Sequence, residues 1–230
     1  MLKYLWIAGL ALMLVSCSPI VAEIPNTTNP IQNVDNRGTT LVNSRPSSAP
    51  EWVEASLQGI DVGVWLPAGW QYDDTGGLTL VEHMSSIHTG EPTHSIMVYF
   101  FVPALENLVD ASEDHDNLAY AALHQVSLSP SLTGAAEVTP PVRLLWGEID
   151  AAYYAYSAPQ EVCGWVLAFA VPDETRILVA NITAPRREVA RLAEILPPML
   201  SDLRINRQRL GEGAVQELSS MISGLEREAG

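Results

Sequence analysis

Residues 59–70 read GIDVGVWLPAGW, and this stretch decides the fold. Apolar side chains at positions 60, 62, 64 and 66 alternate with other residues, a period of two that predicts a half-buried β-strand. Pro67-Ala68-Gly69 then supplies turn residues that end the strand. We therefore expect a strand over 60–66 that runs directly into a turn.

Further strand-like runs follow along the chain. Leu78 to Val81 alternates in the same way, and the aromatic-rich run from Ile96 to Val102 is typical of a central strand. Four more runs lie at 136–146, 150–157, 164–171 and 176–183, and the first is broken at Pro140-Pro141. Their short connections contain turn residues, as in Pro172-Asp173-Glu174, which favours antiparallel hairpins.

Two helices interrupt or close this series of strands. Asp110 and Glu113 have capping-box spacing, and the apolar pattern that follows predicts a helix from about Ser112 to Leu128. A second apolar stripe runs from Val189 to Leu203, and we expect Pro197-Pro198 to kink this helix or to divide it in two. The order of elements predicts an α+β domain with a largely antiparallel sheet flanked by helices.

Two motifs of this domain resemble those of the PsbP-like family. The first is Leu66-Pro67-Ala68-Gly69-Trp70, which follows the opening strand. The second is the closing stretch from Ile195 to Arg204, which has a Ser-x-Leu-Arg type ending. The resemblance extends in layout over residues 51–206. It implies a sheet flanked by helices in a non-enzymatic accessory or binding module, with no catalytic residues to carry over.

The N-terminus has the features of an export signal. Lys3 provides a positive charge, and the apolar run from Leu5 to Val15 is too short for the roughly 20 residues that span a bilayer. The run ends in Leu14-Val15-Ser16-Cys17, which resembles the lipobox of bacterial lipoproteins. The resemblance implies that residues 1–16 are removed and that Cys17 carries the lipid, which anchors the chain on the extracytoplasmic face of a bacterial membrane. An ordinary cleaved signal with a coincidental cysteine is the alternative.

The rest of the chain divides into three parts. Residues 17–50 form the lipidated N-terminus and a linker rich in Pro, Asn, Thr and Ser, with a mean reach of roughly 30 Å. Residues 51–206 form the α+β domain. Residues 207–230 form a tail whose apolar residues have helical spacing, although its glycines weaken a short amphipathic helix there.

Charge and cysteine content limit the function. Residues 17–230 contain 11 Arg and no Lys against 27 Asp and Glu, a net charge of −16 with neutral His. So acidic a chain argues against binding nucleic acid and against docking on anionic headgroups, and leaves a cationic partner open. Once Cys17 is acylated, Cys163 has no intrachain partner, and its apolar surroundings predict a buried structural thiol.

One cluster of side chains has the chemistry of a metal site. Three imidazoles and two carboxylates lie within thirteen residues around an expected strand-loop-strand hairpin: Glu82, His83, His88, Glu91 and His94. These side chains are suitable ligands for Zn²⁺ or Cu²⁺. Their spacing matches no defined metal motif, and the loop composition favours a solvated hairpin instead. A divalent metal site is therefore the alternative hypothesis.

A second acidic group is explained by favourable charge at a helix N-terminus better than by Ca²⁺ binding, because the EF-hand pattern is absent. It comprises Asp110, Glu113, Asp114, His115 and Asp116.

Several aromatic residues could either line a binding groove or pack in the core and on the sheet surface, and we favour the second interpretation. They are Trp52, Trp65, Trp70, Trp146, Trp165, Tyr153, Tyr154 and Tyr156.

These observations favour a lipid-anchored, extracytoplasmic binding or accessory module of the bacterial cell envelope. Its expected partners are the membrane, through the N-terminal lipid, and another envelope protein or ligand. No GxSxG nucleophile motif occurs in the sequence. The rival hypothesis is a small metal-dependent or hydrolytic envelope enzyme that uses Glu82, His83, His88 and His94.

Overall fold

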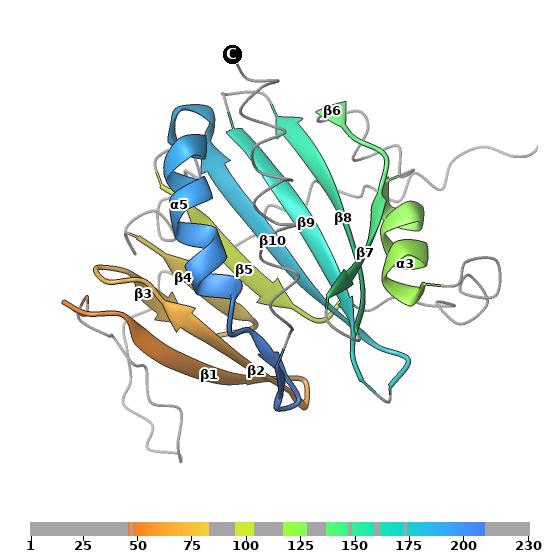
Figure 1. Cartoon of the computed structure of the whole chain (residues 1–230), viewed down its shortest axis with the longest axis horizontal. Coiled ribbons are helices and arrows are strands. Elements are labelled where there is room, and N and C mark those ends of the chain that lie inside the picture. The colour runs from red at the N-terminus through yellow and green to blue at the C-terminus, as the bar shows by residue number, and fades with distance from the viewer. Residues whose placement is uncertain are drawn as a thin grey trace, which may run out of the picture.

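Two antiparallel sheets and two helices make up the described part of the chain (Figure 1). The computed structural model describes residues 46, 48–82, 95–103, 117–127, 137–146, 149–158, 162–172 and 174–209. The fold is therefore α+β with antiparallel sheets flanked by helices, as predicted. No helix among these residues is long and apolar enough to cross a membrane.

The smaller sheet has the strand order β1-β2-β11-β12. Its strands are β1 (Glu51–Leu57), β2 (Ile60–Leu66), β11 (Arg204–Ile205) and β12 (Gln208–Arg209). The predicted strand over 60–66 is confirmed as β2, and its apolar residues at positions 60, 62, 64 and 66 are all buried. The sequence did not predict β1, β11 and β12, and β12 lies within the segment assigned to the tail.

The larger sheet has eight strands in the order β3-β4-β5-β10-β9-β8-β6, with β7 paired to β8. Its strands are β3 (Gln71–Asp73), β4 (Leu78–Val81), β5 (Met97–Phe101), β6 (Glu137–Val138), β7 (Val142–Trp146), β8 (Ile149–Ala158), β9 (Val162–Ala170) and β10 (Ile177–Pro185). The strands predicted from Leu78 onward are confirmed, including the break at Pro140-Pro141 between β6 and β7. The short strand β3 was not predicted.

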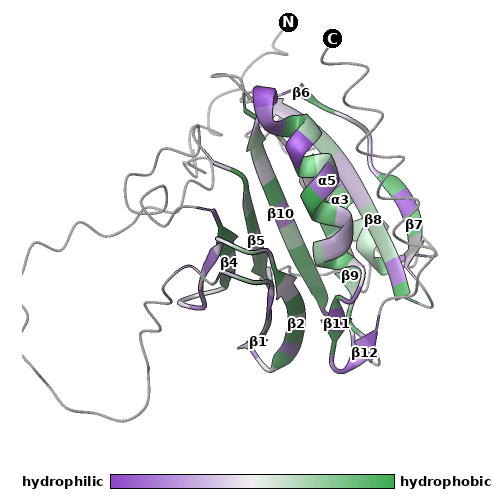
Figure 2. Ribbon diagram, turned by 60° about the vertical axis from the view of Figure 1, so that its left-hand side comes forward, coloured by the Kyte–Doolittle hydropathy of each residue, from purple (hydrophilic) through white to green (hydrophobic). Residues whose placement is uncertain are grey.

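Helix α5 (Val189–Leu200) follows the 3-10 turn η2 (Arg186–Glu188) and closes one side of the larger sheet. It contacts both β2 and β10, so its buried residues Leu192 and Leu196 lie in the same core as Trp165 and the inner residues of the smaller sheet. Figure 2 shows this helix with a hydrophilic and a hydrophobic side. The two sheets and α5 thus share one apolar core.

The expected division of this helix in two at Pro197-Pro198 is wrong, because both prolines lie inside the single helix α5. A proline removes the N–H that would bond to the carbonyl four residues earlier, here those of Ala193 and Glu194. Glu194 and Pro198 are exposed and Ala193 is partly exposed, so these carbonyls lie on the side of the helix that water reaches. The helix ends soon afterwards, where the Ser201 N–H donates to the Pro197 carbonyl at 2.9 Å.

Helix α3 (Leu118–Ser127) packs on the other face of the larger sheet, mainly against β8 and β9. The predicted start near Ser112 is wrong. Asn117 precedes the first helical residue, and its side-chain oxygen accepts a hydrogen bond from the Tyr120 N–H at 2.8 Å, the geometry of an N-cap. The proposed capping residues Asp110 and Glu113 lie outside the described residues.

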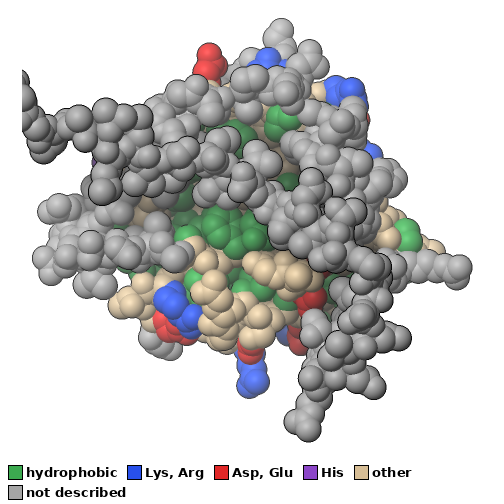
Figure 3. Space-filling model, turned by 180° about the vertical axis from the view of Figure 1, so that it is seen from behind, with side chains coloured by type: hydrophobic (Ala, Val, Ile, Leu, Met, Phe, Trp, Pro, Cys, Tyr) green, Lys and Arg blue, Asp and Glu red, His purple; other side chains and the backbone are tan. Residues whose placement is uncertain are grey.

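Seen from the side opposite α5, hydrophobic side chains gather near the centre of the molecule (Figure 3).

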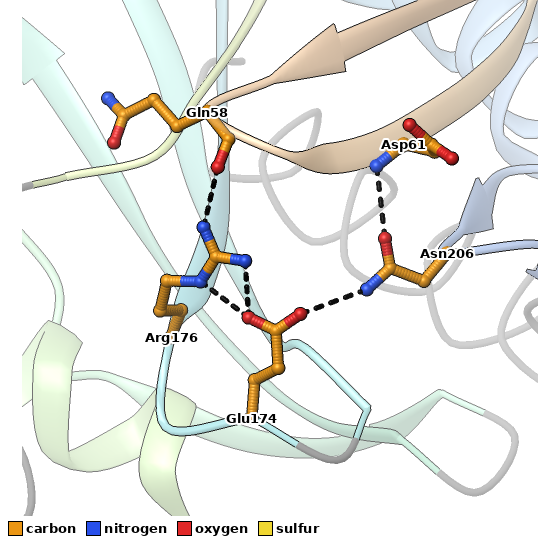
Figure 4. A network of polar contacts seen from close by, with 5 residues as sticks. All are labelled: Gln58, Asp61, Glu174, Arg176 and Asn206. Carbon is orange, nitrogen blue, oxygen red and sulfur yellow. Dashed lines mark hydrogen bonds and ion pairs between the residues drawn. The ribbon is translucent and has the colours of Figure 1, made fainter.

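A polar network joins the turns of three hairpins at one end of the molecule (Figure 4). Arg176, which pairs with Glu174, donates to the Gln58 carbonyl at 2.7 Å. The Asn206 side chain donates to Glu174 at 3.3 Å and accepts from the Asp61 N–H at 3.0 Å. The network therefore connects the β9–β10 turn of the larger sheet with two turns of the smaller sheet.

Candidate functional site

The predicted metal cluster is represented in the described residues by Glu82 alone. This carboxylate follows β4 and forms a two-contact ion pair with Arg191 of α5, in which Nη1 lies 3.1 Å from Oε2. The hydrogen bond that Arg191 donates to Glu82 raises the pKa of Arg191. His83, His88, Glu91 and His94 lie outside the described residues. Among the residues that are described, no group of three or more His, Cys, Asp or Glu side chains gathers as a metal site.

The acidic group from Asp110 to Asp116 lies outside the described residues.

Of the two cysteines, Cys17 also lies outside the described residues, and Cys163 is buried. Cys163 is 6% exposed, and its Sγ lies 3.6 Å from the Ala184 carbonyl oxygen. Burial raises the pKa of the Cys163 thiol, which lowers the fraction of reactive thiolate. The prediction of a buried structural thiol is confirmed.

Most of the aromatic residues pack in the core, as favoured from the sequence. Trp70, Trp146 and Trp165 are buried, and Tyr154 is buried against α3 on the opposite sheet face from Tyr153. Burial raises the pKa of Tyr154 to about 12. A binding groove built from the whole aromatic set is therefore wrong.

Trp52 and Trp65 are the exceptions, and they lie on the outer face of the smaller sheet. They face each other across the β1–β2 pair, with ring centroids 5.4 Å apart in an edge-to-face arrangement. Trp65 is one of two large hydrophobic side chains found exposed among the described residues. Gly63 makes room for the indole of Trp52, since a Cβ on Gly63 would lie 2.5 Å from Cζ2 of that ring.

Charged side chains satisfy the polar edges of both indoles. The Trp52 Nε1–H donates to Glu54 at 2.8 Å, and the Trp65 Nε1–H donates to Asp202 at 3.1 Å. The Arg204 guanidinium lies 4.9 Å from the Trp52 ring centroid, which is a cation–π contact. Asp202 also forms an ion pair with Arg209 of β12. We call this surface the Trp face, and it consists of Trp52, Glu54, Trp65, Asp202, Arg204 and Arg209.

The Trp face combines one exposed and one partly exposed aromatic ring, those of Trp65 and Trp52, with charges of both signs. Such rings offer large contact area at little cost in conformational entropy, which suits a surface that binds a partner. The sequence contained one signal for the Trp face. The alternation in residues 60–66 places Trp65 on the same side of β2 as Asp61 and Gly63, opposite the apolar side. A bulky indole on the solvent side of a strand is a candidate contact residue.

No protein-family model matches the sequence, and no curated protein matches it. Among the solved structures that are similar to the chain are the following two. LpqN of Mycobacterium tuberculosis, described as involved in cell envelope biogenesis, has 10% identity and a TM-score of 0.44, covering 68% of this chain and 91% of LpqN. Cyanobacterial PsbP (CyanoP) from Synechocystis sp. PCC 6803 has 11% identity and a TM-score of 0.43, covering 77% and 99%. The functional argument below rests on this chain's own residues.

Proposed function

We propose that this chain is a lipid-anchored, extracytoplasmic binding or accessory module of the bacterial cell envelope. The observation that carries the proposal is Leu14-Val15-Ser16-Cys17 at the end of a charged start and a short apolar run. Each buried methylene of an acyl chain contributes about 0.8 kcal/mol, so two or three chains on Cys17 hold a protein on a membrane essentially permanently.

The contacts of the described side chains support a binding role over a hydrolytic one. Glu82 is held in its ion pair with Arg191, and the Cys163 thiol is buried with a raised pKa. Both groups serve packing or charge pairing. The Trp face, in contrast, leaves the Trp65 ring exposed and the Trp52 ring partly exposed to a partner.

Metabolic labelling tests the anchor. Cells that express the wild type or Cys17→Ala are grown with an alkyne analogue of palmitate, and label and membrane association are measured after an alkaline wash. We expect labelled, membrane-bound wild type and unlabelled, released Cys17→Ala. Cys163→Ala is the matched control, and it should keep the label because its thiol is buried. An unlabelled wild type, or label that survives Cys17→Ala, overturns the proposal.

A further inference from the structure

We infer that the Trp face rests on the zwitterionic phospholipid headgroups of the bilayer that holds the anchor. This inference rests on the proposed function, and it goes beyond it by naming the surface and the partner. It implies that the domain has a preferred orientation on the membrane rather than hanging free on its linker.

The entry point of the chain places the Trp face next to the tether. Strand β1 begins at Glu51, directly after the predicted linker of residues 17–50, and Trp52 is its second residue. Trp65 lies directly opposite Trp52 in the register of β1 and β2. The tether therefore pulls on the part of the smaller sheet that carries both indoles.

The chemistry of the indoles fits the membrane interface. Tryptophan combines an apolar ring with a polar edge, and it is enriched where headgroups meet acyl chains. Trp65 is 36% exposed, while Trp70, Trp146 and Trp165 are 2% exposed or less. The two indole N–H groups already have partners in Glu54 and Asp202, so the rings can leave water without losing a hydrogen bond.

The charges on this side of the small sheet balance. The charged members of the Trp face are two arginines, Arg204 and Arg209, and two carboxylates, Glu54 and Asp202. A neutral surface of mixed sign matches headgroups that carry both a phosphate and an ammonium group. Arginine is well suited to phosphate because its planar guanidinium donates two parallel hydrogen bonds. The acidic remainder of the chain acts only weakly beyond a Debye length of about 8 Å.

The tether makes a weak contact sufficient. A short flexible linker gives an effective concentration of the order of millimolar, so a contact with a millimolar dissociation constant is occupied about half of the time. Two indoles and a few charge-assisted hydrogen bonds are adequate for such an affinity. The same domain without its lipid would bind vesicles poorly.

Tryptophan quenching on vesicles tests the inference. The full lipidated protein is reconstituted into phosphatidylcholine vesicles that contain a nitroxide-labelled headgroup lipid, and flotation is measured on the same samples. We expect quenching in the wild type. The quenched fraction should fall by about half in Trp65→Phe and to background in the double variant Trp52→Phe and Trp65→Phe, because two indoles share the face. Val142→Ser, which alters the other exposed hydrophobic residue, should leave it unchanged.

The outcomes separate the anchor from the face. Flotation of a protein whose tryptophans remain unquenched overturns the inference and leaves the lipid anchor standing. Failure to float overturns the proposed function itself. Quenching that requires cationic lipid would also contradict the inference, because it would report the acidic bulk of the chain rather than the neutral face. Concentration-dependent self-association that depends on the same two indoles would assign the face to a second copy instead.

Discussion

The two sheets use tryptophan in opposite ways. Trp165 in the central strand β9 is fully buried, whereas Trp65 in β2 is 36% exposed. The difference follows from what covers each sheet: α5 and the smaller sheet cover one face of the larger sheet, and α3 packs on the other. The smaller sheet has one buried face and one outer face that carries aromatic rings. The lesson is that layers, rather than residue type, decide which aromatic residue is available to a partner.

The largest expected effect is a truncation in the larger sheet. Trp165→Ala should reduce the free energy of unfolding by about 3–5 kcal/mol, because it leaves a large cavity in the core. Trp65→Ala should reduce it less, by about 1–2 kcal/mol, since Trp65 is already 36% exposed and loses mainly its contact with Trp52 and its hydrogen bond to Asp202. Urea denaturation of both variants measures the difference. Equal losses would show that the two sheets do not differ as described.

Trp165→Phe sharpens the same comparison. The Nε1–H of Trp165 is buried and has no hydrogen-bond partner. Phenylalanine keeps most of the apolar volume and removes this unpaired donor, so it should cost clearly less than alanine. A phenylalanine variant as unstable as the alanine variant would contradict this interpretation of the buried nitrogen.

Two glycines provide a matched pair of smaller effects. A Cβ on Gly164 would lie 2.3 Å from the Ile182 carbonyl oxygen, while the three atoms nearest to a Cβ on Gly63 all belong to the ring of Trp52. Gly164→Ala should therefore cost about 1–3 kcal/mol, because backbone in a central sheet cannot move aside. Gly63→Ala should cost less and should change the near-ultraviolet circular dichroism as the indole shifts. The reverse order of stability would break the comparison.

Alkaline pH should destabilise the larger sheet through its buried tyrosines. Burial raises the pKa of Tyr154 from 10 to about 12, so the unfolded state loses its proton first. The contribution of protonated Tyr154 to the free energy of unfolding is fully present below pH 10. It falls by about 1.4 kcal/mol for each pH unit as the pH rises from 10 toward 12. Tyr154→Phe should flatten the fall between pH 10 and 12, as measured by denaturation at fixed pH. An unchanged slope would place the cause in other groups.

The smallest effect is expected where the two sheets meet through polar contacts. Arg176→Met removes the 2.7 Å hydrogen bond to the Gln58 carbonyl and the ion pair with Glu174, at a cost of about 1 kcal/mol because the side chain is partly exposed. Arg187→Met is the control, since its contact with Glu188 is 3.7 Å long and 66% of its side chain is exposed. Thermal unfolding should separate the two variants, and identical midpoints would remove the network from the account.

The strands were predictable because their signal is local. Alternation in residues 60–66 and 78–81, and apolar runs bounded by turn residues, indicated β2, β4 and the hairpins of the larger sheet. Helix ends were harder, because Asp110, Glu113 and Asn117 all have the chemistry of a cap. The apolar stripe of α5 indicated which side of the helix is buried, but it did not show that Pro197-Pro198 would be tolerated within one helix.

The Trp face required information that no local pattern contains. Glu54, Gly63 and Arg204 lie side by side on three neighbouring strands, because Gly63 pairs with Glu54 of β1 and with Arg204 of β11, a strand far along the chain. The partners of Trp65 likewise come from distant segments, such as Asp202. Strand register between remote segments depends on the whole packing of the domain, so composition identified the aromatic residues but not their arrangement.

Mass spectrometry of the mature N-terminus tests the central claim most directly. The protein is extracted from membranes, digested, and searched for the first peptide of the chain. We predict a peptide that begins at Cys17 and carries the added mass of its acyl groups. A first peptide that begins elsewhere, or one that contains Cys17 as a free thiol, would contradict the anchored module.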